Sequence, residues 1–261
     1  MQNNTFSTLF VGQNLIKLSA VDSTNNFLKG LVSKSEPLPE GTVIMADDQF
    51  AGRGQQENIW HAEPGKNLTI SILLKPSFLP LNKQFLLNMA VSIALNNALT
   101  KFASNDVFIK WPNDVYYKDK KLGGVLIENS IVGSAIKNSI IGIGLNVNQP
   151  CFSADLSNKA ISLYQILQQD VNLQLLLAEI CSQIESFYLQ LKAGKHTFLR
   201  DTYVDKLYKI NQPALYRQNG EVFEGVIIGV SDEGLLNVKR DDQLLQFNFK
   251  EIEFINNTEN K

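Results

Sequence analysis

Two apolar runs, at residues 41–46 and 68–74, restrict the fold of this chain most strongly. Both are short and rich in aliphatic side chains, which predicts two buried strands of one sheet. The segment between them contains Gly52-Arg53-Gly54. Glycines let a backbone adopt a positive φ and approach a ligand closely, and an arginine between them projects a planar cation. This pattern predicts a loop that binds an anionic, phosphorylated small molecule, although glycine–arginine turns also occur as plain surface loops.

The periodicity of the remaining chain predicts an α+β fold, in which a mixed sheet packs with helices. A helix should begin at Asp22-Ser23-Thr24, whose side-chain oxygens suit an N-cap. Further strands are expected at residues 10–18, 107–111, 115–117, 122–128 and 139–148. Further helices are expected at residues 82–102, 173–191 and 195–208, with another starting near Ser162.

The character of the chain changes near Lys209. Beyond it, short apolar stretches alternate with turn signals such as Asn219-Gly220. Asn-Gly between alternating runs is a strong hairpin signal, so we expect a small antiparallel β-barrel of four or five strands. The predicted division is therefore a main domain of residues 1–208 and a barrel of residues 209–261, of which residues 256–261 should be frayed.

The composition excludes several classes of function. The formal net charge of −2 supplies no global positive field to hold DNA or an anionic membrane. The two cysteines, Cys151 and Cys181, are too few for a disulfide framework and lack metal-ligand spacing. The N-terminus lacks a signal-peptide pattern, and no apolar run reaches the length of a membrane span. We therefore expect a cytoplasmic protein.

Several polar or glycine positions allow two interpretations. Ser23 and Thr24 could simply cap a helix, which their residue types favour. Lys121 could lie at a solvated hairpin tip, but Gly123-Gly124 shortly after it leaves room for a ligand. Gly142 and Gly144 could form a flat wall for a ring system, or they could allow close packing of a strand against a helix.

Four separated segments resemble the catalytic part of biotin–protein ligases, which are also called biotin–acetyl-CoA-carboxylase ligases. The matching motifs are Asp22-Ser23-Thr24-Asn25, Gly52-Arg53-Gly54 with Trp60 behind it, Lys110-Trp111-Pro112-Asn113-Asp114 followed by Lys121-Leu122-Gly123-Gly124, and Gly142-Ile143-Gly144-Leu145-Asn146. Each motif is modest alone, but their order and spacing together are specific. The resemblance extends over essentially the whole chain, including the expected barrel.

The resemblance implies a reaction in two steps at one site of the main domain. Biotin and MgATP would form biotinyl-5′-adenylate and pyrophosphate, and the biotinyl group would then pass to a lysine. The partner would be the biotin carboxyl carrier domain of acetyl-CoA carboxylase or a related carboxylase. Because the motifs begin close to the N-terminus, we expect no DNA-binding winged-helix domain, hence a monofunctional ligase. Relatives of this kind also pair into homodimers, which is a further expectation.

The resemblance also implies the roles of individual residues. Arg53, Lys121 and Asp114 would be catalytic, the two cations following the charge that develops during adenylation. The biotin-binding residues would be Ser23, Thr24, Gln49, Gly52, Arg53, Lys121, Gly123, Gly124, Gly142 and Gly144. The nucleotide-binding residues would be Arg53, Gly54, Trp60, Asn113, Lys121 and Asn146, with Asn146 also near Mg²⁺.

One segment departs from the family pattern. Many members continue Gly-Arg-Gly with further arginines, whereas Gln55-Gln56-Glu57-Asn58 follow here. A rival interpretation is a lipoate- or octanoate-protein ligase or transferase, but the Gly-Arg-Gly and Lys-Trp-Pro-Asn-Asp segments resemble the biotin group. A second rival is a non-catalytic biotin-binding module. Simple biotin binding would not need both Arg53 and Lys121, so catalysis is the favoured interpretation.

Overall fold

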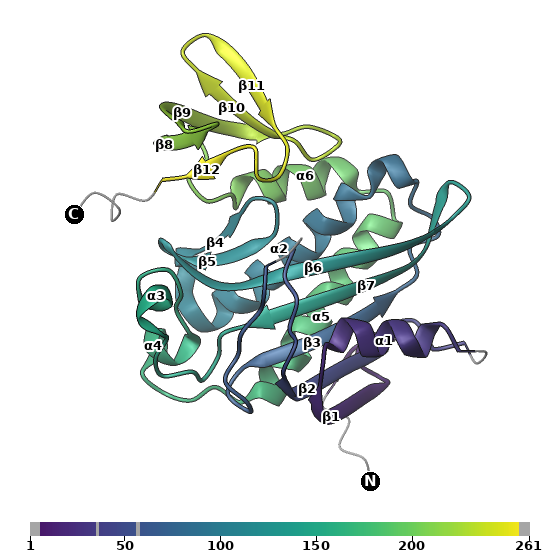
Figure 1. The fold of residues 1–261 in the computed structure, drawn as a ribbon. Helices are drawn as coiled ribbons and strands as arrows, with labels where there is room; N and C mark the ends of the chain where they lie inside the picture. The colour runs from purple at the N-terminus through teal and green to yellow at the C-terminus, as the bar shows by residue number, and fades with distance from the viewer. Residues whose placement is uncertain (1–5, 35–36, 56–57, 256–261) are drawn as a thin grey trace.

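The computed structural model describes residues 6–34, 37–55 and 58–255. Its main part is a seven-stranded sheet of order β1-β2-β3-β7-β6-β5-β4 (Figure 1). Strand β1 pairs with β2 in parallel and the other neighbours pair antiparallel, so the sheet is mixed as expected. The strands are β1 (Leu15–Val21), β2 (Val43–Gln49), β3 (Leu68–Leu74), β4 (Val107–Lys110), β5 (Asp114–Tyr117), β6 (Lys120–Val132) and β7 (Ala135–Leu145).

Helices cover both faces of this sheet (Figure 1). The α-helices are α1 (Thr24–Val32), α2 (Phe85–Ala103), α3 (Ala154–Ser157), α4 (Leu163–Leu167), α5 (Leu173–Lys192) and α6 (His196–Asp205). Two 3₁₀ turns, η1 (Leu81–Lys83) and η2 (Ser104–Asp106), flank α2. Most of the buried core lies on the face that α2 and α5 cover, whereas a smaller cluster around Leu28 and Ile44 lies beneath α1. All described helices are too short or too polar to cross a membrane.

Two asparagines of α2, Asn88 and Asn96, hold the backbone at the start of β4 and in the segment that follows it. Asn96 Nδ2 donates to the Val107 carbonyl at 2.7 Å, and Asn88 Nδ2 donates to the Pro112 carbonyl at 2.8 Å. Both asparagines are buried, and these bonds satisfy their Nδ2 donors. The Asn88 bond anchors the turn between β4 and β5, which contains Asn113 and leads into Asp114, the first residue of β5.

The C-terminal part is a five-stranded antiparallel sheet of order β11-β10-β9-β8-β12. Its strands are β8 (Pro213–Gln218), β9 (Glu221–Val230), β10 (Leu236–Arg240), β11 (Gln243–Phe247) and β12 (Glu253–Phe254). Trp111 Nε1 donates to the Gly234 carbonyl at 2.9 Å, and the Trp111 ring packs against Phe249. The C-terminal sheet therefore lies against the β4–β5 turn. Closure into a barrel and the boundary at Lys209 stay predictions, and residues 256–261 lie outside the described residues.

The strand expected at residues 10–18 is displaced, since β1 begins only at Leu15. The preceding backbone is held instead by the buried carboxylate of Glu185 on α5. It accepts hydrogen bonds from the N–H groups of Leu9, Phe10 and Val11 at 2.7, 2.8 and 3.0 Å. A long-range side-chain contact of this kind leaves no local sequence signal.

Replacing Glu185 with Gln should lower the free energy of unfolding by about 2 kcal/mol, because the amide offers one acceptor oxygen where the carboxylate offers two. Urea unfolding measures the change. Glu179→Gln on the same helix is the matched control, since Glu179 pairs with the half-exposed Lys101 and its loss should cost less than about 1 kcal/mol. Equal costs for the two variants would contradict the anchoring role of Glu185.

Candidate active site

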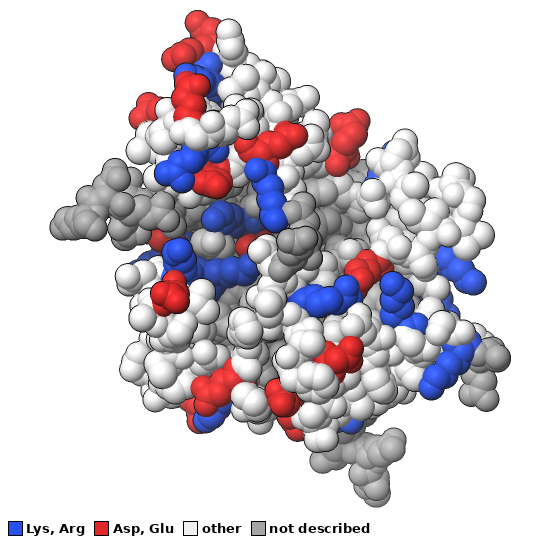
Figure 2. All heavy atoms as spheres, viewed as in Figure 1, with Lys and Arg blue, Asp and Glu red and all other residues white. Residues whose placement is uncertain are grey.

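A cavity opens between the start of α1, strands β6 and β7, and the segment after β2. Figure 2 shows Lys and Arg side chains gathered around the hollow between the C-terminal strands and the main sheet. Most of the residues that the sequence singles out line this cavity. They are Ser23, Thr24, Gln49, Arg53, Gly54, Trp60, Asn113, Asp114, Lys121, Gly124, Gly142 and Gly144.

Gly52 and Gly123 do not line the cavity, but their packing explains why they are glycines. Neither Gly52 nor Gly54 has a positive φ, so that expectation is wrong. A Cβ on Gly52 would collide with the Trp60 carbonyl, and a Cβ on Gly123 would collide with Leu145. Close backbone and core approach is thus the physical reason at these two positions.

A second cavity adjoins the first, and Gln49, Trp60 and Lys121 line both. Asn146 lines this second cavity. Its Nδ2 donates to the carbonyls of Lys121 and Ile161 at 3.5 and 3.2 Å, so Oδ1 of the same amide points away from them. The predicted nucleotide residues therefore divide between two adjoining cavities.

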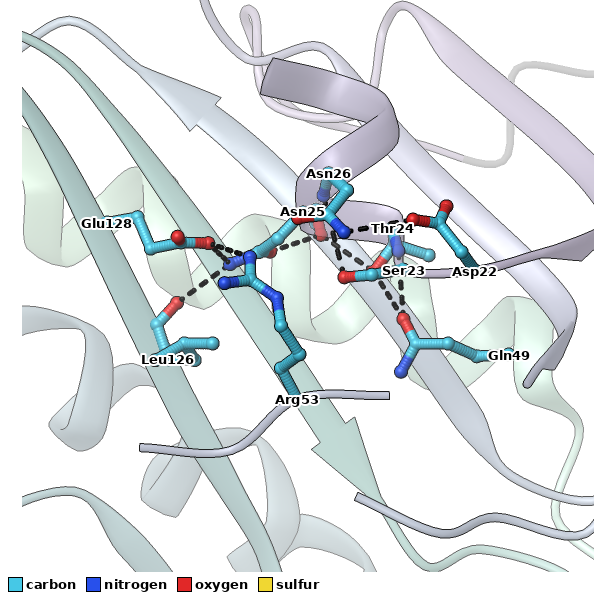
Figure 3. Close-up of polar contacts among 10 residues, drawn as sticks. Asp22, Ser23, Thr24, Asn25, Asn26, Gln49, Arg53, Leu126 and Glu128 are labelled. Carbon is cyan, nitrogen blue, oxygen red and sulfur yellow. Dashed lines mark hydrogen bonds and ion pairs between the residues drawn. The ribbon is translucent and has the colours of Figure 1, made fainter. Parts of the chain in front are cut away.

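A hydrogen-bonded network occupies the start of α1 (Figure 3). Gln49 Oε1 accepts from the Thr24 backbone N–H at 2.8 Å and from Thr24 Oγ1 at 3.1 Å. Ser71 on β3 contacts Thr24 Oγ1 at 2.8 Å and donates to Asn25 Oδ1 at 2.5 Å. Ser23 is the N-cap of α1 and also lines the cavity, so its two interpretations are compatible.

Both predicted cations form ion pairs with carboxylates. Arg53 Nη2 lies 2.7 Å from Glu128 Oε2, and Lys121 Nζ lies 2.7 Å from Asp114 Oδ2. Lys121 belongs to β6 and lines both cavities, so it does not lie at a solvated tip. The Lys121–Asp114 pair packs on Gly124, where a Cβ would lie 2.7 Å from Asp114 Oδ1. Each cation is therefore held at the cavity by a protein anion.

The glycine wall on β7 is filled by protein side chains. An added Cβ on Gly142 would lie 2.5 Å from Asn25 Oδ1, and one on Gly144 would collide with the Trp60 indole. The ring system that packs on Gly144 is thus the indole of this chain. The absence of a side chain at Gly142 and Gly144 leaves the space in which Asn25 and Trp60 pack.

Sequence reasoning assigned no role to Glu128, Ser71 or Asn25. Glu128 Oε2 also accepts from Asn25 Nδ2 at 2.7 Å, which connects Arg53 to the network of α1. A signal existed for two of them, because Ser71 interrupts an aliphatic run and Asn25 lies within a recognised motif. Glu128 ends the strand that was predicted at residues 122–128, and its partners could be found only in three dimensions.

Two titratable groups beside the cavity have shifted pKa values. Asn26 Nδ2 donates to Asp22 at 2.9 Å and, with the backbone, holds the pKa of that carboxyl below its ordinary value. Burial raises the pKa of Tyr116, and the nearby charge of Asp114 raises it further. Asp22 is thus an anion and Tyr116 a neutral phenol at pH 7.

The segment after Gly54 makes a neutral contact. Gln55 Nε2 donates to Asn113 Oδ1 at 2.8 Å, and Asn113 Nδ2 donates to the Val125 carbonyl at 3.0 Å. Gln56 and Glu57 lie outside the described residues. The amide of Gln55 therefore ties this segment to the β4–β5 turn.

Comparison with known proteins identifies this architecture. Residues 18–146 match the model of the biotin/lipoate A/B protein ligase family. The bifunctional ligase/repressor BirA of Bacillus spizizenii is 29% identical over 248 residues, which are 94% of this chain and 75% of that protein. The biotin–[acetyl-CoA-carboxylase] ligase of Paracoccus denitrificans is 25% identical over 226 residues, covering 84% of this chain and 91% of the relative.

A solved structure matches both parts of the fold. Biotin protein ligase from Aquifex aeolicus, in complex with biotin and ATP, superimposes with a TM-score of 0.77 at 27% sequence identity. The match covers 92% of this chain and 98% of the Aquifex chain. The motifs, the fold and these relatives agree, and the chain belongs to the biotin/lipoate A/B protein ligase family, among its biotin–protein ligases.

Proposed function

We propose that this protein is an ATP-dependent biotin–protein ligase, which forms biotinyl-5′-AMP and transfers the biotinyl group to a lysine of a carrier protein. One observation carries the residue-level proposal. Arg53 and Lys121, from separate segments, line the same cavity as the hydroxyl and amide groups of Ser23, Thr24 and Gln49. A cavity lined both by cations and by neutral donors and acceptors suits a ligand with a carboxylate and a ureido ring.

The chemistry needs both cations. A carboxylate oxygen of biotin attacks the α-phosphorus of ATP, and pyrophosphate leaves with the electron pair of the broken P–O bond. Because both reactants are anions, Arg53 and Lys121 reduce their repulsion and stabilise the charge that develops on the phosphorus oxygens. Glu128 and Asp114 hold these cations in place before a ligand arrives. Less reorganisation is then needed during the reaction.

The second step uses the mixed anhydride as an acyl donor. A neutral lysine amine attacks the carbonyl carbon, AMP leaves, and the nitrogen loses one proton. Asp114 lies at the cavity beside Lys121 and is suited to orient the incoming amine. Its carboxylate can accept a hydrogen bond from that amine.

The biotin ring would lie near the start of α1. Ureido groups need both donors and acceptors, which Ser23, Thr24 and Gln49 supply. Thr24 orients the Gln49 amide through two hydrogen bonds to Oε1. Trp60, Gly54, Asn113 and Asn146 would contact the nucleotide, with the adenine against the indole that rests on Gly144.

Asn146 fits a site for Mg²⁺ that arrives with the nucleotide. No group of three or more acidic, His or Cys side chains in the described ranges is placed to hold a metal ion. Mg²⁺ commonly keeps several waters and binds through substrate phosphates, so an amide oxygen such as Asn146 Oδ1 could complete its shell. Bound Mg²⁺ would neutralise phosphate charge beside Lys121.

The finer assignments belong to the same proposal. The acceptor is the biotin carboxyl carrier domain of acetyl-CoA carboxylase or a related carboxylase. The protein acts in the cytoplasm, where two copies pair into a homodimer. Residues 1–208 form the catalytic domain and residues 209–261 the small barrel.

Exchange of labelled pyrophosphate into ATP tests the adenylation step. We expect exchange that depends on biotin and does not occur with lipoate or octanoate. Exchange with lipoate or octanoate alone would assign the protein to the rival ligases. Measurable biotin binding without exchange would indicate a non-catalytic module.

Lys121→Ala should lower the rate of adenylation by about 100-fold and change the biotin affinity by less than about threefold, because its contact is strongest in the transition state. Pyrophosphate exchange and calorimetry measure the two quantities. Lys120→Ala is the matched control, since the adjacent Lys120 donates to the Ser157 carbonyl outside both cavities. Small and equal losses for Lys121→Ala and Lys120→Ala would refute the role of Lys121.

Gly144→Ala and Gly142→Ala should affect different substrates, the first mainly ATP and the second mainly biotin. The methyl group at Gly144 displaces Trp60 and should raise the KM for ATP about tenfold or more. The methyl group at Gly142 displaces Asn25 and should act mainly on biotin. Steady-state kinetics with each substrate varied in turn gives both constants, and a larger ATP effect from Gly142→Ala would contradict the assignment.

A further inference from the structure

Glu128 connects the two groups of side chains that the proposed function uses. Its Oε2 accepts from Arg53 Nη2 and from Asn25 Nδ2, each at 2.7 Å (Figure 3). Asn25 in turn accepts from Ser71 and is seated on Gly142. The carboxylate therefore lies between the Arg53 cation and the polar network at the start of α1.

The exposure of the three side chains shows that Glu128 orients Arg53, and not the reverse. Arg53 is a long side chain with 41% exposure, and an exposed ion pair is weak when both partners move freely. Glu128 is less exposed, at 25%, and Asn25 is 3% exposed. Because Asn25 holds the carboxylate from the buried side, Glu128 presents Arg53 with an acceptor that is already oriented.

The contact with Glu128 leaves most of the Arg53 guanidinium able to bind a ligand. The guanidinium has five N–H donors, and the contact with Glu128 uses one of them. Within the described residues the guanidinium makes no other hydrogen bond, so its other donors can contact an anion bound in the cavity that Arg53 lines. A hydrogen bond through one donor lowers the conformational freedom of the Arg53 side chain, while the other donors can still bind an anion.

We propose that Glu128 is a positioning residue, which holds the Arg53 guanidinium over the cavity for adenylate formation. This inference rests on the proposed function, because Arg53 must act on the ligand for its position to matter. The opposite possibility is that Glu128 competes with the ligand for Arg53. In that case, removing Glu128 would speed the reaction.

A double-mutant cycle tests this role. The variants are Glu128→Ala, Arg53→Ala and the combination, and the readout is single-turnover formation of biotinyl-AMP from biotin and MgATP. We expect Glu128→Ala to slow this step about tenfold while the biotin affinity changes less than threefold. In the Arg53→Ala background, Glu128→Ala should cause no further loss. An unchanged or faster rate in the single variant, or losses that multiply in the double variant, would overturn the proposal.

Two further variants separate positioning from general damage. Glu128→Gln keeps an acceptor oxygen of the same reach and should recover part of the rate, and it replaces Glu128→Ala in the cycle if circular dichroism shows that the alanine variant is unfolded. Glu253→Ala removes a surface ion pair with Arg217 and should leave the rate unchanged. If the unaltered protein forms no biotinyl-AMP, the proposed function fails together with this inference. If it forms the product and the cycle shows no coupling, this inference fails alone.

Discussion

The site depends on holding two cations at one cavity before any anion is bound. Unpaired cations on long side chains would repel each other and move freely, so the chain pairs each with a carboxylate. Lys121 pairs with Asp114 across β5 and β6, and Arg53 pairs with Glu128 on β6. Strand β6 thus contributes one residue to each pair, Lys121 to the first and Glu128 to the second. The arrangement places two positive charges at the wall of one cavity.

The sheet makes room for this arrangement through glycines on two neighbouring strands. Gly124 on β6 accommodates the Lys121–Asp114 pair, and Gly142 and Gly144 on β7 seat Asn25 and Trp60. Each added methyl group would meet a side chain of the site. The glycines therefore connect the packing of the sheet to the geometry of the cavity.

The sequence predicted the main elements where the signal is local. The apolar run at residues 68–74 is strand β3 with the same bounds, and the amphipathic stretch from Leu173 forms α5. Most of the residues that the motifs single out line one cavity. The misplaced first strand and the unassigned Glu128 have a common cause, since both depend on contacts between residues far apart in the chain. The periodicity of apolar residues in the sequence indicates which residues are buried. It does not indicate which side chains from distant parts of the sequence contact a given segment.

Isolation of biotinyl-AMP tests directly whether this protein joins biotin to ATP at the cavity. The protein would be incubated with biotin and ATP labelled at the α-phosphate, without a carrier, and the quenched mixture would be separated to quantify labelled biotinyl-AMP. We expect nearly one molecule of biotinyl-AMP per protein molecule, which disappears when a biotin carboxyl carrier domain is added and becomes biotinylated. Absence of biotinyl-AMP from a protein that binds both biotin and ATP would contradict this expectation.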